Sequence, residues 1–172
     1  VMLRLTARTS KGVDGAALLD PVAEQICARL GGAVFSTCGE KMPDLVVRLL
    51  HAREQTAATA ESCTGGRVCD MLISVPGASK AVLAGCVAYS NEEKMRALSV
   101  RAETLSRFGA VSEEVAREMA EGARCATGAD YAVSTTGIAG PDGGTKEKPV
   151  GTVCLACAGP DGTRAETIRL RG

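Results

Sequence analysis

The sequence predicts an α/β fold, a three-layer α/β/α sandwich in which helices cover both faces of a mixed sheet. Three observations support this prediction. Strand-like and helix-like patterns alternate from residue 56 onward, residues 81–89 are apolar almost throughout, and the last two strand-like segments meet at a turn over residues 159–162. The chain has 172 residues, of which 45% are hydrophobic, so it can bury a core of ordinary size.

The N-terminal residues predict a small β-α-β unit ahead of the sandwich. Residues 2–8 alternate apolar and polar side chains, as a half-buried strand does, and residues 33–36 form a second short strand. Between them, residues 15–30 carry apolar side chains at helical spacing. We therefore place a first domain at residues 1–39 and a second domain at residues 40–172.

The second domain is expected to alternate helices with the strands of a mixed sheet. Its longest helix is capped by Ser112, has Glu113 and Glu114 in its first turn, and ends near Gly128. A long loop follows the third strand. The predicted helices lie at 42–53, 64–74, 91–98 and 102–108, the strands at 56–60, 81–89, 130–136, 150–158 and 163–170, and the loop at 137–149.

Composition excludes several classes of function. The chain has 20 basic and 20 acidic residues and no basic run, which argues against binding nucleic acid by bulk electrostatics. Its four aromatic residues are too few for base-stacking platforms. The apolar runs are too short to span a bilayer, and the N-terminus has no signal-peptide pattern, so we expect a soluble, cytoplasmic protein.

The cysteines and the single histidine limit the chemistry further. Most of the eight cysteines have apolar neighbours and are predicted to be small buried residues. Cys154 and Cys157 have a metal-like spacing, but on a strand they point to opposite faces, so no metal site is expected. His51 ends a predicted helix, as a cation favoured by the helix dipole does. A general base would then be a lysine, a carboxylate or a tyrosine.

A strand-to-helix junction at residues 60–66 is the first candidate site. Free main-chain N–H groups and a helix dipole at such a junction suit an oxyanion or a phosphate, and Ser62 lies where a nucleophile could meet them. The alternative is structural: Ser62 or Thr64 caps the helix, and the glycines at 65 and 66 allow close packing. Cys63 is a rival nucleophile, although no histidine is available to activate it.

Two further segments are candidates. The loop that begins at Thr135 leaves a strand end and is rich in glycine and hydroxyl groups, which suit a nucleotide phosphate or ribose, or else it is a flexible surface loop. Tyr89 ends a strand, and Lys94 lies in the first turn of the next helix. The positive end of a helix dipole lowers the pKa of a lysine there toward that of a general base. The alternative is a solvated lysine beside Glu93.

In order along the chain, these segments resemble the C-terminal domain of the CinA family, the nicotinamide-nucleotide amidases. The N-terminal stretch also resembles the KH-like connecting domain of longer CinA proteins. The matching motifs are AESCTGG (60–66), VPGAS (75–79), VAYSNEEK (87–94), FGAVSEEVAREMAEGAR (108–124), TGIAGPDGG (136–144) and EKPVGTV (147–153).

The resemblance implies that nicotinamide mononucleotide is hydrolysed to nicotinate mononucleotide and ammonia, a step of pyridine nucleotide salvage. It implies Ser62 as nucleophile and Lys94 as base, with Tyr89 hydrogen-bonded to them, and no cofactor or metal. The main-chain amides around Thr64, Gly65 and Gly66 would hold the oxyanion. The loop residues Thr136, Gly137, Ile138, Ala139 and Gly140 would hold the ribose-phosphate.

The resemblance also carries a departure and two alternatives. The family continues with an arginine and a closing helix where this sequence ends at Leu170-Arg171-Gly172, so we expect that helix to be absent. The main alternative is a catalytically silent nucleotide-binding or regulatory module of a competence-related protein. RNA binding through the KH-like unit is disfavoured, because that unit has no basic Gly-x-x-Gly loop. We expect a small-molecule nucleotide substrate, no membrane partner and a homo-oligomer.

Overall fold

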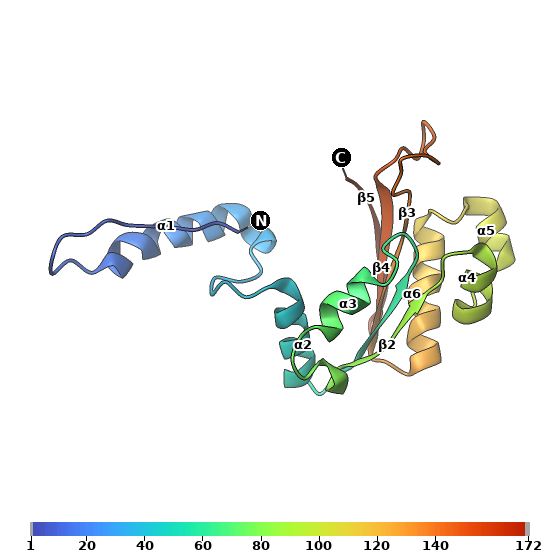
Figure 1. Ribbon diagram of the computed structural model, residues 1–172, viewed down its shortest axis with the longest axis horizontal. Coiled ribbons are helices and arrows are strands. Elements are labelled where there is room, and N and C mark those ends of the chain that lie inside the picture. The colour runs from blue at the N-terminus through green and yellow to red at the C-terminus, as the bar shows by residue number, and fades with distance from the viewer. Residues whose placement is uncertain (1, 171–172) are drawn as a thin grey trace. The chain divides into compact units, whose positions relative to one another are not determined.

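The computed structural model describes residues 2–170 (Figure 1). The chain divides into two compact units, the first up to Leu45 and the second from Val46 onward. The division into domains at residue 39/40 remains a prediction.

The first unit contains one complete α-helix and the start of a second, and it has no strand among its described residues. Helix α1 spans Gly15–Leu30, and its N-cap residue Asp14 accepts a hydrogen bond from the Ala16 amide at 3.0 Å. A 3-10 turn, η1, follows at Gly31–Ala33. The predicted strands at 2–8 and 33–36 are therefore wrong, and the structure gives no evidence of a KH-like β-α-β unit. Apolar alternation alone does not make a strand, because the strand's main chain needs a pairing partner.

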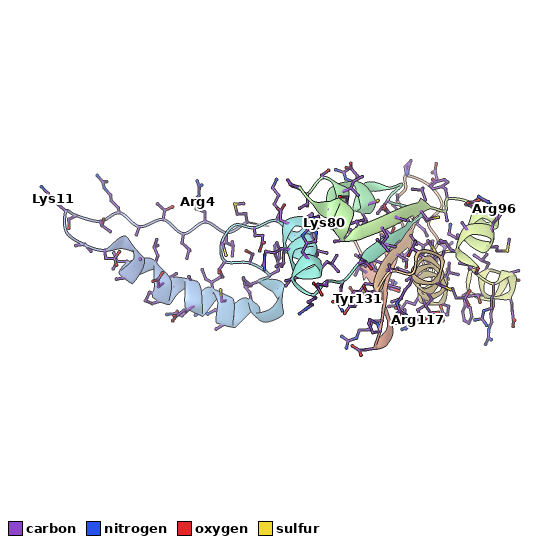
Figure 2. The ribbon with its side chains drawn as sticks, turned by 90° about the horizontal axis from the view of Figure 1, so that it is seen from below. Arg4, Lys11, Lys80, Arg96, Arg117 and Tyr131 are labelled. Atoms are coloured by element: carbon purple, nitrogen blue, oxygen red, sulfur yellow. The ribbon has the colours of Figure 1, made fainter. Side chains whose placement is uncertain are left out.

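The segment before α1, which was predicted to be a strand, has no strand beside it to pair with among the described residues. The stretch that carries Arg4 and Lys11 runs alongside α1 without strand pairing (Figures 1 and 2). Helix α1 itself buries none of its side chains fully, and Leu18 and Val22 on its apolar stripe remain about half exposed, at 51% and 46%.

The second unit is built on a five-stranded mixed sheet, as the sequence predicts. The strand order is β2-β1-β3-β4-β5, with β2, β1 and β3 parallel and β4 and β5 antiparallel to their neighbours. The strands are β1 Ala57–Glu61, β2 Val82–Val87, β3 Tyr131–Gly137, β4 Thr152–Gly159 and β5 Gly162–Arg169, and the remaining helices are α2 Met42–Ala52, α3 Arg67–Ile73, η2 Ala78–Lys80, α4 Asn91–Leu98, α5 Ala102–Phe108 and α6 Glu113–Thr127.

Helix α6 covers one face of the sheet, and α4 and α5 pack on it (Figure 1). It begins and ends as predicted: the Ser112 hydroxyl accepts from the Val115 amide at 3.3 Å, and Gly128 adopts the left-handed conformation. Met119 is fully buried against the alanines of β1 and β3, and burying such a side chain contributes about 1.5–3 kcal/mol. A Cβ at Gly122 would collide with the main chain of Leu98, so this glycine lets α4 approach α6.

Helix α3 covers the opposite face over β1 and β2. A Cβ at Gly85 would collide with Cys69, which shows how closely α3 lies on β2. The apolar residues 81–89 are typical of a strand that is covered on both faces, and this prediction is wrong for β2. The strand lies at the edge of the sheet, and Leu83 and Val87 are each 47% exposed. Its apolar sequence is typical of interior parallel strands, and periodicity does not report position within a sheet.

Further expectations concern cysteines and membranes. Cys154 is buried and Cys157 exposed, so they point to opposite faces of β4 as predicted. In residues 2–170, no cluster of three or more His, Cys, Asp or Glu side chains is placed to hold a metal ion. Nor does any helix in that range have the length and apolar character needed to cross a membrane.

Candidate functional site

The candidate site lies at the carboxyl ends of the three parallel strands. Ser62 follows β1, Ala88 and Tyr89 follow β2, and the loop 138–149 follows β3. Ligand sites in open α/β sheets form at this edge, where loops from neighbouring strands meet. Segments far apart in the sequence are thereby brought together, as the resemblance implied.

Lys94 and Ser62 are in direct contact. Ser90 caps α4, its hydroxyl accepting from the Glu93 amide at 3.1 Å, and this places Lys94 in the first turn. The Lys94 side chain is only 1% exposed. Its Nζ lies 3.0 Å from Ser62 Oγ and donates to the main-chain carbonyls of Ala88 at 2.9 Å and Tyr89 at 3.2 Å.

The surroundings of Lys94 favour its uncharged form. Burial lowers the pKa of Lys94 below its ordinary value, because the ammonium loses its hydration. Its three hydrogen-bond partners are two carbonyls and a hydroxyl, all of them neutral. The solvated lysine that the sequence left open as an alternative is therefore excluded.

Tyr89 takes part through its main chain. Its side chain is 77% exposed, and the contact with Lys94 Nζ is made by its carbonyl oxygen. The expectation of a hydrogen-bonding tyrosine side chain in this group is corrected accordingly, because the strand end turns the ring outward while the carbonyl points to Lys94.

Glu61, the last residue of β1, fills the helix start that was expected to bind an anion. Its side chain is 1% exposed. Its Oε2 accepts from the amides of Gly66 and Val68, both at 3.0 Å, and its Oε1 accepts from the Cys69 amide at 2.7 Å. The Gly66 amide is thus unavailable to an oxyanion, and neither Ser62 nor Thr64 caps α3.

The amide of Gly65 is also engaged, donating to the Ser62 carbonyl at 3.1 Å. The expectation that Gly65 and Gly66 donate to an oxyanion is therefore wrong in this structure. Both glycines adopt positive φ, 60° and 98°, so they form the tight turn that returns the chain into α3. Their role is in the path of the main chain.

The carboxylate of Glu61 is held in its charged form. Burial alone would raise the pKa of Glu61, but hydrogen bonding by Thr64 and by the amides of Cys69, Val68 and Gly66 more than offsets burial, so the pKa is lowered. The start of α3 consequently carries its own buried negative charge, one residue before Ser62.

Cys63 is poorly suited to act as the nucleophile. Burial raises the pKa of its thiol above the ordinary value, which disfavours the reactive thiolate. Next to it, the hydroxyls of Thr64 and Thr135 lie 2.6 Å apart, and the Ser62 amide donates to the Thr135 carbonyl at 2.9 Å. These contacts fix the turn that presents Ser62.

Thr136 is buried away from the site. Its side chain is 1% exposed, and its hydroxyl donates to the Ala110 carbonyl at 2.8 Å. The expectation that this hydroxyl donates to a phosphate or ribose is wrong here, because strand alternation turns Thr136 toward α6 and Thr135 toward the Ser62 turn.

The rest of the glycine-rich loop is partly engaged within the protein. Ile138 donates its amide to Thr152 and accepts from Gly151 with its carbonyl, at 2.9 and 2.8 Å. A Cβ at Gly137 would lie 3.1 Å from the Cys63 sulfur, so this glycine allows the close approach of the Ser62 turn. Substrate binding by Ala139 and Gly140 stays a prediction.

Lys148 anchors the far end of this loop. Its Nζ donates to the carbonyls of Phe108 at 2.8 Å and Val111 at 2.6 Å. The carbonyls of the turn 108–111 thus accept hydrogen bonds from Thr136, just before the loop, and from Lys148, near its end. Both ends of the loop are therefore held by hydrogen bonds to the turn that precedes α6.

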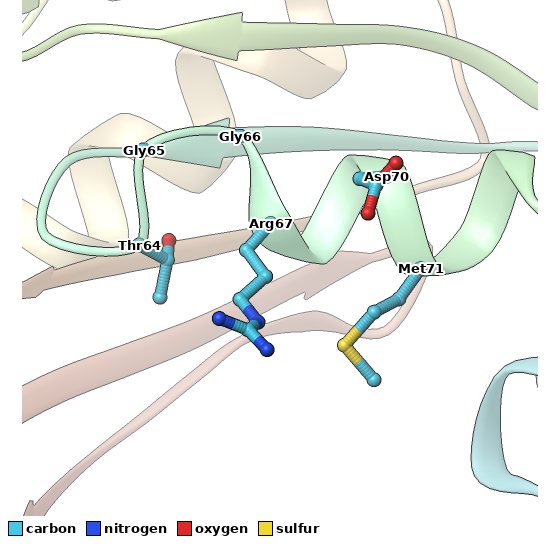
Figure 3. Close-up of a pocket in the computed structure, with 6 residues that line it drawn as sticks. All are labelled: Thr64, Gly65, Gly66, Arg67, Asp70 and Met71. Carbon is cyan, nitrogen blue, oxygen red and sulfur yellow. The ribbon is translucent and has the colours of Figure 1, made fainter.

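An open pocket of about 670 Å³ lies beside the Ser62 turn (Figure 3). Thr64 and Arg67 project into it from the turn and the start of α3, and Met71 projects from the next turn of the helix. The lining residues are Thr64, Gly65, Gly66, Arg67, Asp70 and Met71.

The sequence reasoning overlooked Glu61, Arg67 and Lys148, and it did not predict the contact of Thr135 with Thr64. The position of Glu61 could have predicted its role. A carboxylate that directly follows a strand, here residues 57–60, and precedes a helix start is placed to accept hydrogen bonds from the free amides of that helix. The contacts of Thr135 and Lys148 span 71 and about 40 residues of sequence, and no local pattern encodes them.

Known proteins are similar to this chain in sequence. The sequence matches the family model of the CinA C-terminal domain over residues 39–172. A CinA-like protein of Anaeromyxobacter dehalogenans is 51% identical over 95% of this chain and 40% of its own length. One of Kosmotoga olearia is 45% identical over 100% of this chain and 42% of its own length, so the chain spans about two fifths of these relatives.

Solved structures agree with the sequence matches. The competence/damage inducible protein CihA of Agrobacterium tumefaciens superposes with a TM-score of 0.72 at 41% identity, over 74% of this chain and 78% of that one. A competence-damaged protein (CinA) superfamily protein of Escherichia coli gives 0.73 at 36% identity, over 76% of each chain. By sequence, fold and family model, the chain belongs to the CinA family of competence/damage-inducible proteins.

Proposed function

We propose that this chain hydrolyses the carboxamide of nicotinamide mononucleotide, giving nicotinate mononucleotide and ammonia. The observation that carries the proposal is the contact between the buried Lys94 Nζ and Ser62 Oγ at 3.0 Å. A serine with a lysine base is one of the ways in which an amide bond is attacked without histidine. The ordered motifs shared with the nicotinamide-nucleotide amidases supply the substrate class.

The hydrogen bonds of Lys94 give its neutral form a defined orientation. A neutral amine has two N–H donors and one lone pair, and the carbonyls of Ala88 and Tyr89 are placed to accept the two protons. The lone pair then points to Ser62 Oγ and can accept the hydroxyl proton. Ser62 would attack the carboxamide carbon as its proton passes to Lys94.

The later steps use the same pair. The tetrahedral intermediate collapses when Lys94 returns the proton to the departing nitrogen, which leaves as ammonia and leaves an ester on Ser62. Lys94 then takes a proton from water, which attacks the ester, and returns that proton to Ser62 Oγ as nicotinate mononucleotide is released. The amide of Thr64 is a candidate oxyanion donor, because no hydrogen bond within residues 2–170 engages it.

Ammonia release tests the proposal. Nicotinamide mononucleotide should yield ammonia and nicotinate mononucleotide with the wild-type chain, and Ser62→Ala should lower kcat by about three orders of magnitude or more. Cys63→Ala is the matched control and should retain most of the activity. Mononucleotide binding without ammonia release would favour the catalytically silent module, and loss of activity in Cys63→Ala alone would make the thiol the nucleophile.

A further inference from the structure

The anion-binding capacity of the α3 start is already used. Glu61 occupies the amides of Gly66, Val68 and Cys69, and it adds a buried negative charge beneath them. A phosphate near Ser62 therefore cannot rely on these amides. It needs a cationic side chain close enough to outweigh the charge of Glu61.

Arg67 is such a cation. It is exposed and lines the open pocket next to the Ser62 turn. Lys94 and Lys148 both donate to main-chain carbonyls, whereas within residues 2–170 no hydrogen bond or ion pair engages the Arg67 guanidinium. Asp70 is three residues along the helix, but its carboxylate lies apart from the guanidinium (Figure 3). Arg67 is thus free to receive a ligand.

The pocket also lies next to the turn that carries Ser62. Ser62 and Gly65 close a tight turn through a 3.1 Å hydrogen bond, so their Cα atoms are within about 7 Å of each other. A Cβ at Gly65 would meet open space, which leaves the main chain accessible to a ligand. A molecule lying over this turn can reach Ser62 with one end and Arg67 with the other.

We propose that this pocket is the ribose-phosphate subsite and that Arg67 binds the phosphate. The inference rests on the proposed function and moves the phosphate from the loop 136–140 to α3. The guanidinium can donate two parallel hydrogen bonds to phosphate oxygens, a contact that the riboside lacks because it has no phosphate. Arg67 is then the residue that selects nucleotides over nucleosides.

The test compares nicotinamide mononucleotide with nicotinamide riboside. Arg67→Ala should lower kcat/KM for the mononucleotide about 30- to 100-fold, mainly through KM, and should change kcat/KM for the riboside less than about twofold. Arg67→Lys should restore part of the loss. Arg53→Ala, which removes an exposed arginine before the amino end of β1, is the control and should behave as wild type.

Binding is measured in parallel, so that each failure can be assigned. Calorimetry with nicotinate mononucleotide should show binding to wild type and weak or undetectable binding to Arg67→Ala. If Arg67→Ala releases ammonia and prefers the mononucleotide to the riboside as strongly as wild type does, the proposed subsite is wrong. Binding that depends on Arg67 without ammonia release from wild type supports the subsite and overturns the proposed amidase. Absence of both overturns both.

Discussion

Replacing Glu61 with glutamine should cost the protein a large part of its stability. The carboxylate accepts three main-chain hydrogen bonds at 3.0, 3.0 and 2.7 Å. A glutamine can keep its oxygen on Gly66 and Val68, but its NH₂ group then faces the Cys69 N–H. One buried amide loses its acceptor at a cost of about 1–3 kcal/mol, and two bonds lose their charge, so the free energy of unfolding should fall by about 2–5 kcal/mol.

Urea unfolding of wild type and Glu61→Gln at several pH values measures this cost. The control is Glu93→Gln, which removes a partly exposed carboxylate paired with the exposed Arg96 and should have a much smaller effect. Because the folded pKa of Glu61 is lowered, its stabilisation is complete above the ordinary value of about 4.3 and is lost as the pH falls toward the folded value. A difference below about 1 kcal/mol at pH 7 would refute the argument.

Two other substitutions test the site. Lys94→Met should abolish ammonia release and leave the protein at least as stable at pH 7. The pKa of Lys94 is lowered in the folded protein, so wild type loses stability as the pH falls below about 10.4, the ordinary lysine value. A wild type whose melting temperature does not rise toward pH 10, or a strongly destabilised variant, would show instead that Lys94 is held as an ammonium. Thr136→Val should lower the free energy of unfolding by about 1–3 kcal/mol, because the Ala110 carbonyl loses its donor, while KM stays within about twofold. A tenfold rise in KM with unchanged unfolding would return this hydroxyl to the substrate.

Local patterns predicted the second unit well. The predicted bounds of α4 and α5 agree with the structure, and Ser112 and Gly128 are the caps of α6. These features depend on caps and helical periodicity, which a short window of sequence contains. The strands at 2–8 and 33–36 failed because their existence depends on a pairing partner that no local pattern specifies.

The candidate site was predictable in its reacting groups and not in its surroundings. Ser62 and Lys94 lie on motifs at strand ends, and their contact follows once the parallel order of β1 and β2 is known. Which amides remain free is a different question, because the answer depends on the Glu61 side chain folding back on the helix start. Likewise, the side to which Thr136 points follows from the register of β3 against its neighbours.

The hydrogen bonds from Lys94 to the main-chain carbonyls of Ala88 and Tyr89 have an evolutionary consequence. A carbonyl belongs to the path of the chain, so replacing the side chain at position 89 leaves both acceptors in place. The exposed Tyr89 side chain can therefore be replaced, or can take part in an unrelated contact, without removing a hydrogen-bond acceptor from Lys94. Removing either acceptor would instead require a change in the path of the main chain after β2, which few single substitutions produce.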